Sequence, residues 1–567
     1  MKITPIAAAL LTLTSMSTVA ATYSITPLPV NNKAKGTFAQ SIDNSDFMLV
    51  TTSNEFNSPI DVKRLTQTNF FSTNEASIES EEDIRNGIFS DIDYTLIVNY
   101  LIVQNDQSAF SLRKQKIAQF KSYATDLVNT QFIAGFDNYV EKFDDFSKSV
   151  TTIAYDSVDG DFIVGSSQSP FVDVEYTNAD DQLIRYTVND ILRRAFVQVG
   201  SDTTALLPKD KLANGLSEAF AVNRNFQVGG YSSTRFSPAL RDSVAACADE
   251  NERGDVPEEV CLFGIITGAE FEQNSSKRAT VWQLSASGEV LSQETFPLPF
   301  EPESNQFAWE NRILNINNNG LAVGWTHTGD SVRLLLPDNQ VPVNRPEQHA
   351  TYFKDGATVA FLSDERDLSS QATAVNDSGW ITGTVFRAPN EVARERFFVH
   401  NAATAETRYP DGFFVNAGVK PQAINNKNIV VGGADIESSN EANRETNAFM
   451  YDINADEFVN LNQLTQCDTP YLLVEAIDIN DDNEIIANAR IRANERYASG
   501  TPILDENGEN IKVDKIVAVK LSPIANGQIE ACDEKEQPNY ERAAATGTFV
   551  SLLALCLLIC LRRRKLC

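Results

Sequence analysis

The residues best spaced for metal chemistry in this 567-residue chain are Asp478, Asn480 and Asp482. Oxygen ligands at alternate positions open a calcium-binding loop, where carboxylates and amides surround the cation. Asn483 stands where such a loop has glycine, and the position for the closing glutamate holds Ala489. The segment predicts either calcium ligands or a hairpin turn, where Asp and Asn are favoured for backbone reasons. No other cofactor is predicted.

Patterns typical of catalysis are missing from the sequence. The histidines are His327, His349 and His400, and none stands in the spacing of a zinc motif. No nucleophile elbow, phosphate-binding loop or dinucleotide-binding glycine run occurs. Paired carboxylates could cleave glycosidic bonds, but 77 acidic residues offer pairs everywhere, so spacing selects none. The sequence therefore favours a protein that is not an enzyme.

One phrase recurs four times in the C-terminal half: LNINNNGLAVGWT, ATAVNDSGWITGTV, PQAINNKNIVVGGA and AIDINDDNEIIANA. The matching residues Asn317, Asn376, Asn425 and Asn480 are 59, 49 and 55 residues apart. A period near fifty, made of short apolar runs and turn residues, is typical of stacked β-units.

Each phrase predicts a hairpin of two strands. Gly320, Gly379, Asn428 and Asn483 stand three residues after the Asn, and these residue types enter the left-handed region easily. A third run with a central aromatic residue follows, as in 395–401, and then a fourth, as in 457–461. Four short antiparallel strands per unit predict a propeller blade.

Less regular copies extend the repeat toward the N-terminus. They begin at 39–50, 153–165 and 219–230, which gives about seven four-stranded blades over residues 22–525, with six as the alternative. Between about 83 and 150 the spacing of apolar residues becomes helical, as at Phe110, Ile117, Phe120, Ala124 and Leu127. We expect an all-β propeller with a helical insertion there, which either covers one face as a lid or packs on a blade.

The repeated phrase, followed by A-[FT]-x-[WYF], is similar to the HAF-type repeats of exported bacterial proteins. The whole layout, including the start TYSITPLPV at 22–30, resembles a domain-of-unknown-function family of Gram-negative envelope proteins. The resemblance covers nearly the whole chain, most strongly from about residue 219. It implies a propeller fold and an address in the envelope, and no activity.

Both ends of the chain predict targeting. Residues 1–21 have Lys2, an apolar stretch and small residues, as in a secretory signal peptide. A linker at 526–542 leads to an uncharged stretch at 543–561, long enough to span a bilayer, and to a basic tail at 562–567. The positive-inside rule keeps this tail cytoplasmic and places the propeller in the periplasm or at the surface. The tail also resembles C-terminal sorting signals that are cleaved, which is the alternative to a permanent anchor.

The exported part contains four cysteines, which predicts disulfides in an oxidising compartment. Proximity favours Cys247 with Cys261 and Cys467 with Cys532, and the other two pairings stay open. Metal binding is disfavoured, because no CxxC pair or histidine partner is near.

The net charge of −30 is spread along the chain, and no basic face suits nucleic acid. Such acidity favours solubility, with a divalent cation or a cationic partner as the alternative. We expect a non-catalytic, membrane-tethered module that binds an envelope protein or glycan across one propeller face. The alternative is an envelope glycan hydrolase or lyase with carboxylates in the propeller funnel.

Overall fold

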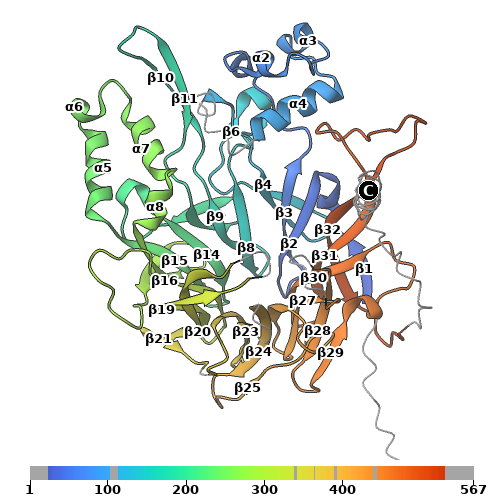
Figure 1. Cartoon of the computed structure of the whole chain (residues 1–567). Helices are drawn as coiled ribbons and strands as arrows, with labels where there is room; N and C mark the ends of the chain where they lie inside the picture. The colour runs from blue at the N-terminus through green and yellow to red at the C-terminus, as the bar shows by residue number, and fades with distance from the viewer. Residues whose placement is uncertain are drawn as a thin grey trace, which may run out of the picture. The chain divides into compact units, whose positions relative to one another are not determined.

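A computed structural model describes residues 23–102, 113–336, 341–362, 364–388, 393–438 and 444–529. They contain seven four-stranded antiparallel sheets, the blades of a β-propeller (Figure 1), so the predicted all-β fold and the number seven are confirmed. From the inner to the outer strand, blades 1 to 7 are β2(Ala34–Ile42), β3(Met48–Glu55), β4(Phe120–Thr125), β5(Thr130–Ile133); β8(Thr152–Val158), β9(Phe162–Ser167), β12(Arg194–Val199), β13(Asp202–Leu206); β14(Ser217–Val222), β15(Gln227–Phe236), β16(Ser275–Leu284), β17(Val290–Thr295); β18(Asn311–Ile316), β19(Ala322–Leu334), β20(Val343–Lys354), β21(Ala357–Ala360); β22(Ser369–Val375), β23(Trp380–Arg387), β24(Arg394–Asn401), β25(Thr407–Arg408); β26(Val419–Ile424), β27(Ile429–Asp435), β28(Thr446–Asp452), β29(Glu457–Asn460); and β30(Leu472–Ile479), β31(Ile485–Asn494), β32(Lys512–Pro523), β1(Tyr23–Pro27).

The blades form a closed ring. Each inner strand contacts the inner strand of the next blade, and β30 of blade 7 contacts β2 of blade 1. The first strand of the chain completes the last blade, because β1 pairs antiparallel with β32, with Tyr23 opposite Pro523. The two ends of the propeller are thereby held together by a sheet ladder, which the sequence did not predict.

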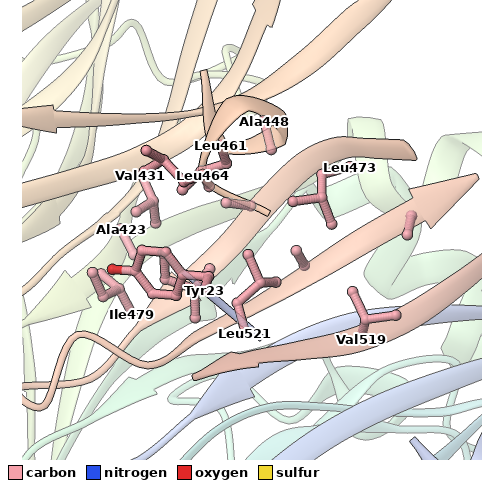
Figure 2. Close-up of a cluster of buried hydrophobic side chains, with 14 of the residues drawn as sticks. Tyr23, Ala423, Val431, Ala448, Leu461, Leu464, Leu473, Ile479, Val519 and Leu521 are labelled. Atoms are coloured by element: carbon pink, nitrogen blue, oxygen red, sulfur yellow. The ribbon is translucent and has the colours of Figure 1, made fainter. Parts of the chain in front are cut away.

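The closing strand also contributes to the core. Tyr23 is only 3% exposed and belongs to an apolar cluster with side chains of blades 6 and 7. Figure 2 shows its ring near Ile479 and Leu521, with Ala423 and Val431 in the same cluster. Full burial of a large apolar side chain stabilises a fold by about 1.5–3 kcal/mol, so this residue helps to hold the ring shut.

The turn residues of the repeat have the predicted conformation. Gly320, Gly379, Asn428 and Asn483 have φ values of +75°, +81°, +67° and +62°. They lie in the left-handed region, as a tight hairpin between the first and second strands requires.

The glycine near the end of the first three phrases, at Gly324, Gly383 and Gly432, is required for a different reason. Each inner strand has a β-bulge near its middle. In five blades the residue before the bulge faces a glycine of the second strand, where a Cβ would meet an inner-strand carbonyl oxygen. At Gly383 that Cβ would lie 2.1 Å from the carbonyl oxygen of Gln371. The equivalent glycines are Gly165, Gly230, Gly324 and Gly432. The bulge is common to all seven blades, and the glycine accompanies it in blades 2 to 6.

The two ends of the ring differ. We call the end with the hairpins that follow the inner strands, at 43–47, 159–161, 223–226, 317–321, 376–379, 425–428 and 480–484, the turn face. The opposite end, which we call the insertion face, has the connections from the second to the third strands. These connections contain α1(Val62–Leu65), α2(Phe70–Asn74), α3(Glu81–Arg85) and α4(Asp91–Ile102) in blade 1; β10(Val172–Thr177) and β11(Leu183–Val188) in blade 2; and α5(Pro238–Ala248), α6(Glu250–Arg253), α7(Glu258–Ile266) and α8(Ala269–Gln273) in blade 3. Figure 1 shows helices of blades 1 and 3 and the β10–β11 hairpin at the top and left of the view.

Short elements complete the described chain. They are β6(Tyr139–Val140) and β7(Asp145–Phe146), with 3-10 turns η1(Pro29–Asn32), η3(Glu141–Phe143), η4(Leu212–Asn214) and η5(Leu461–Leu464).

The predicted bounds of the helical insertion are wrong. Helices begin at Val62 and extend to Ile102, whereas residues 120–133 contain strands β4 and β5 of blade 1. The third strand of a blade packs against neighbouring strands and blades, so its two faces are both buried and strict alternation is lost. The buried residues Tyr123 and Ala124 are adjacent for this reason and imitate helical spacing.

The predicted disulfide between Cys247 and Cys261 is present, with 5.6 Å between the Cα atoms. It joins α5 to α7 inside the blade 3 insertion, which is the staple that the sequence predicted. The second predicted pair, Cys467 with Cys532, includes a residue outside the described part of the chain and stays a prediction.

Candidate functional site

The repeated asparagine links neighbouring blades at the turn face. Asn376 is 3% exposed, and its side-chain oxygen accepts from the backbone N–H of Trp380 at 3.0 Å. Its amide nitrogen donates to the carbonyl of Asn425 in the next blade at 2.9 Å. The same bond joins Asn223 to Asn317, Asn317 to Asn376, Asn425 to Asn480 and Asn480 to Asp43, at 2.8, 2.9, 3.0 and 3.3 Å. An amide places a donor and an acceptor on two separate atoms, one toward each partner, which explains why the residue recurs.

Blades 1 and 2 depart from this pattern. Asp43 holds the asparagine position of blade 1, and one oxygen accepts from the N–H of Phe47 at 3.0 Å. The other oxygen accepts from the N–H of Gly160 in blade 2 at 2.8 Å. Blade 2 has a shorter turn, in which Val158 pairs with Phe162. The backbone N–H of Gly160 therefore makes the bond to blade 1 in place of an asparagine side chain. A carboxylate, which accepts on both oxygens, suits this place.

Acidic side chains beside the ring are satisfied in the same way. The backbone and side-chain nitrogens of Asn318 donate to Asp377, both at 2.9 Å. Those of Asn426 donate to Asp481 at 2.9 and 3.1 Å. The ring leaves a central cavity of about 180 Å³. A hollow of about 620 Å³ lies at the same face, between the turns of blades 1 and 7 and the end of blade 7 at 522–526. The polar groups of the ring itself therefore hold blades together.

Two carboxylates lie on inner strands inside the ring. Asp156 accepts from the N–H of Val222 at 2.8 Å and from the hydroxyl of Ser41 at 3.1 Å. Asp478 accepts from the N–H of Ile42 at 2.9 Å. Burial, with the nearby charge of Asp478, raises the pKa of Asp156 to about 7. Burial likewise raises the pKa of Asp478 to about 6.

Blade 4 indicates what these carboxylates do. Asn315 follows the bulge as they do, and it accepts from the N–H of Val375 in blade 5 at 3.2 Å. In all three places a side-chain oxygen satisfies an inner-strand N–H of the following blade. An amide performs this task without a charge, so the two carboxylates are first of all structural acceptors.

The residues of the predicted calcium loop form a turn. The side-chain oxygen of Asn480 accepts from the backbone N–H groups of Asp482 and Glu484 at 3.0 and 2.9 Å. Asp478 lies on the inner strand of blade 7 and accepts from the backbone N–H of Ile42 in blade 1, and Asp482 is exposed. Within the described ranges, no three His, Cys, Asp or Glu side chains are grouped to hold a metal ion. This geometry corresponds to the hairpin alternative, and calcium stays a prediction.

Each histidine has a local partner. His327 accepts on Nδ1 from the N–H of Glu310 at 3.0 Å, and burial lowers its pKa to about 4. His349 lies 3.6 Å from a carboxylate oxygen of Glu347. Nδ1 of His400 lies 2.8 Å from the hydroxyl of Thr407. His327 is thus uncharged at neutral pH.

The insertions of four blades contact one another on the insertion face. A loop of blade 7 joins the helices of blade 1, these join the hairpin of blade 2, and the hairpin tip joins the helices of blade 3. The bonds are Ala498 N to Thr95 Oγ1 at 2.9 Å, Arg185 Nη1 to Gln67 Oε1 at 3.0 Å, and Ala179 N to Asp255 Oδ2 at 2.6 Å. Blades 7, 1, 2 and 3 thus form a continuous wall, whereas blades 4 to 6 have shorter connections at 335–342, 388–393 and 436–445.

A cavity of about 550 Å³, which we call the rim pocket, lies on the side of these shorter connections. Its basic residues are Arg345, Arg394, Lys420 and Arg444, its acidic residues are Glu395, Asp435 and Glu475, and Leu336, Phe386, Ala393, Gly418, Gly433 and Thr446 complete it. Sequence reasoning missed this pocket. The available signal was a basic residue near the start of three successive third strands, in a chain of net charge −30.

A second cavity, of about 520 Å³, lies between the base of the β10–β11 hairpin and α7. Its apolar walls include Val172, Val188, Leu262 and Ile266. The rim pocket and this second cavity therefore differ in chemistry, because one is charged and the other is mainly apolar.

The predicted targeting segments lie outside the described residues. These are the signal peptide at 1–21, most of the linker at 526–542, the apolar segment at 543–561 and the basic tail at 562–567. Among the residues that are described, no helix combines the length and apolar character needed to span a bilayer.

Fold and surface together define a seven-bladed β-propeller with non-repeating insertions and cavities at its insertion face. The chain belongs to the family described as "Protein of unknown function (DUF3466)", which matches residues 2–564. No curated protein matches it.

Solved structures show distant likeness. An oligogalacturonate lyase in complex with manganese has 12% identity and a TM-score of 0.33, over 72% of this chain and 83% of that one. The propeller domain of the Trilobed protease from Pyrococcus furiosus has 11% identity and a TM-score of 0.33, over 75% and 90%. TolB from Acinetobacter baumannii has 7% identity and a TM-score of 0.27, over 67% and 81%. Likeness at this level carries no argument about activity.

Proposed function

We propose that the protein is a non-catalytic binding module of the cell envelope or surface, exported and tethered by its C-terminal segment. The observation that supports this proposal is the asymmetry of the two faces. The turn-face ring spends its polar groups on bonds between blades, whereas the helices and the β10–β11 hairpin, which do not repeat from blade to blade, lie at the insertion face together with the rim pocket and the apolar cavity. Non-repeating loops on a rigid scaffold are the usual means by which such folds bind partners.

The course of the chain supports a tether behind the binding face. Tyr23 and Pro523 are paired at the turn-face end of blade 7, so the propeller begins and ends there. A C-terminal tether would therefore start from the turn-face end of the propeller. An extended linker over 526–542 reaches up to about 60 Å, enough for a partner to approach.

A glycan hydrolase or lyase is the second candidate. The raised pKa values of Asp156 and Asp478 favour it, because acid–base catalysts have such values. Their oxygens, however, accept backbone N–H groups inside the ring. We rank this function second, and retained glycan cleavage by Asp156→Asn and Asp478→Asn variants would exclude these carboxylates.

Site-specific photocrosslinking in cells tests the proposal. A photoreactive residue replaces Leu183 or Val341 on the insertion face, which are 70% and 67% exposed. Matched controls replace Ser287 or Ala455, which are exposed in turn-face hairpins. We expect discrete crosslinked species from insertion-face positions only. Equal crosslinking from both faces, or none from the insertion face, would contradict the proposal.

Cell fractionation with intact mass measurement tests the tether. A membrane-bound form that retains residues 543–561 supports a permanent anchor. A form that ends near 545–547, at the surface or in the medium, supports a cleaved sorting signal. A full-length form in the cytosol would contradict export.

A further inference from the structure

The rim pocket contains an unbalanced positive charge. Lys420 pairs with Glu395 at 3.0 Å, and Arg444 pairs with Asp435 at 2.8 Å. Arg394, the first residue of β24, has no carboxylate within ion-pairing distance among the residues that the structure describes. Burial and the charge of Arg444 lower the pKa of Arg394, and the opposing effect of the Asp435 charge is smaller. An anionic group would relieve this repulsion.

The geometry of the arginine side chain indicates which kind of anion the pocket binds. A guanidinium offers parallel N–H donors in one plane, which match two oxygens of a carboxylate or of a phosphate. The three acidic side chains of the pocket repel a singly charged carboxylate less than a phosphate monoester, which carries about two negative charges, so we assign the carboxylate. Arg345 is exposed at the mouth of the same cavity and adds a second positive charge for such a ligand.

The acidic residues of the pocket indicate which chemical groups the rest of the ligand carries. Glu475 accepts from Gln422 at 2.7 Å through one oxygen, and its second oxygen is an additional acceptor in the pocket. With Asp435 and Glu395 it gives the pocket several carboxylate acceptors, which suit ligand hydroxyl groups. A ligand with one carboxylate among several hydroxyls fits this mixture, whereas an acidic peptide would bring a carboxylate at every residue against the three acidic side chains of the pocket.

Two glycines keep the cavity open. A Cβ on Gly418 would lie 2.8 Å from Oδ2 of Asp435, and a Cβ on Gly433 would lie 3.3 Å from Cγ of Glu475. A side chain at either position would displace an acceptor of the pocket.

We propose that the rim pocket binds a uronic-acid unit of a glycan, with its carboxylate on Arg394 and its hydroxyls on the acidic side chains of the pocket. This inference rests on the proposed binding function and assigns its ligand class. Binding needs no covalent step and no cofactor.

Calorimetric titration of the purified full-length protein in detergent tests the assignment. The probes are a tetrasaccharide of galacturonic acid, a tetrasaccharide of glucuronic acid, neutral maltotetraose and tetraglutamate peptide. We expect binding of at least one uronate tetrasaccharide, weakened by salt, and none of the neutral sugar or the peptide at the same concentration. Arg394→Gln should weaken uronate binding at least tenfold. The matched control Arg492→Gln, which removes an exposed arginine paired with Asp514 outside the pocket, should leave it unchanged.

Several results would overturn the inference: no uronate binding at millimolar concentration, equal binding of maltotetraose or of the peptide, or unchanged affinity of a folded Arg394→Gln variant. Equal unfolding midpoints of the two arginine variants show that both are folded. If the insertion face still crosslinks a partner in cells, such a failure removes the uronate assignment alone. Loss of crosslinking as well would remove the binding function itself.

Discussion

Replacing Asn376 by aspartate isolates the bond between blades, because the two side chains have the same shape. The carboxylate can still accept from the N–H of Trp380, as the amide oxygen does at 3.0 Å. It cannot donate to the carbonyl of Asn425 or to the side-chain oxygen of Asn428, which the amide reaches at 2.9 and 2.8 Å. Two oxygens would then face a charged oxygen in a site that is 3% exposed.

The expected cost follows from these two bonds. A buried acceptor left without its donor costs about 1–3 kcal/mol, so the variant should lose about 3 kcal/mol in free energy of unfolding. Protonation restores one donor, so the pKa of the new carboxyl group should be raised in the folded state. The loss should therefore shrink as pH falls from 7 toward 4.

Urea unfolding followed by tryptophan fluorescence measures the loss. Asn507→Asp, at an exposed turn, controls for the added charge. The reciprocal change Asp43→Asn should also destabilise, because an amide would turn its N–H₂ toward the N–H of either Phe47 or Gly160. A change below about 0.5 kcal/mol in both Asn376→Asp and Asp43→Asn would refute the role of this ring in holding blades together.

Three further changes test other parts of the fold. Asp156 and Asp478 have raised pKa values of about 7 and about 6, so they favour the folded state at low pH and lose this contribution as pH rises from about 4 to 7. The Asp156→Asn variant lacks this titration, so its free energy of unfolding relative to the natural protein should rise by about 1–2 kcal/mol between pH 5 and pH 8. Its amide faces the N–H of Ser157 or Val222 at both pH values, and this cost cancels in the comparison. A parallel pH dependence of the two proteins would contradict this. Tyr23→Ala should lower the free energy of unfolding in urea by about 3 kcal/mol and speed hydrogen exchange in β32. Tyr23→Phe should cost little, because the hydroxyl contacts only a methionine sulfur at 3.8 Å. Equal effects of the two variants would argue against a role of the buried ring in closing the propeller. Replacing Cys247 and Cys261 by serine removes a disulfide between residues 14 positions apart, which stabilises the fold by about 3 kcal/mol through loss of unfolded-chain entropy. Limited proteolysis should then show faster cleavage within 238–273, while the propeller ring stays intact. Unchanged cleavage would argue against a stabilising role of the disulfide in this insertion.

Local features of the blades were predictable from the sequence. The asparagine, the left-handed turn residue and the glycine lie close together in the chain, and each follows from backbone geometry within one hairpin. The position of the last four blades could be predicted from Asn317, Asn376, Asn425 and Asn480 alone.

Features that depend on distant segments were not predictable. The pairing of Tyr23 with Pro523 joins the two ends of the propeller, and a five-residue strand has no local mark of its partner. The rim pocket likewise combines residues of four blades, and Arg394 differs from other surface arginines only through what the fold places beside it. The predicted bounds of the helical insertion were wrong because strand β4 is buried on both faces, so its sequence does not alternate between apolar and polar residues.

The most regular part of the sequence is the part least suited to binding. Repetition arises because every blade must meet the same two demands, a capped turn and a partner for the next blade. Asn376 and its equivalents satisfy these demands with all their polar atoms, so little capacity is left for a ligand. Arg394, by contrast, has a charge that the described blades do not balance, and it lies beside connections that vary from blade to blade. The partner of this protein should therefore be sought at the irregular face, where the sequence stops repeating.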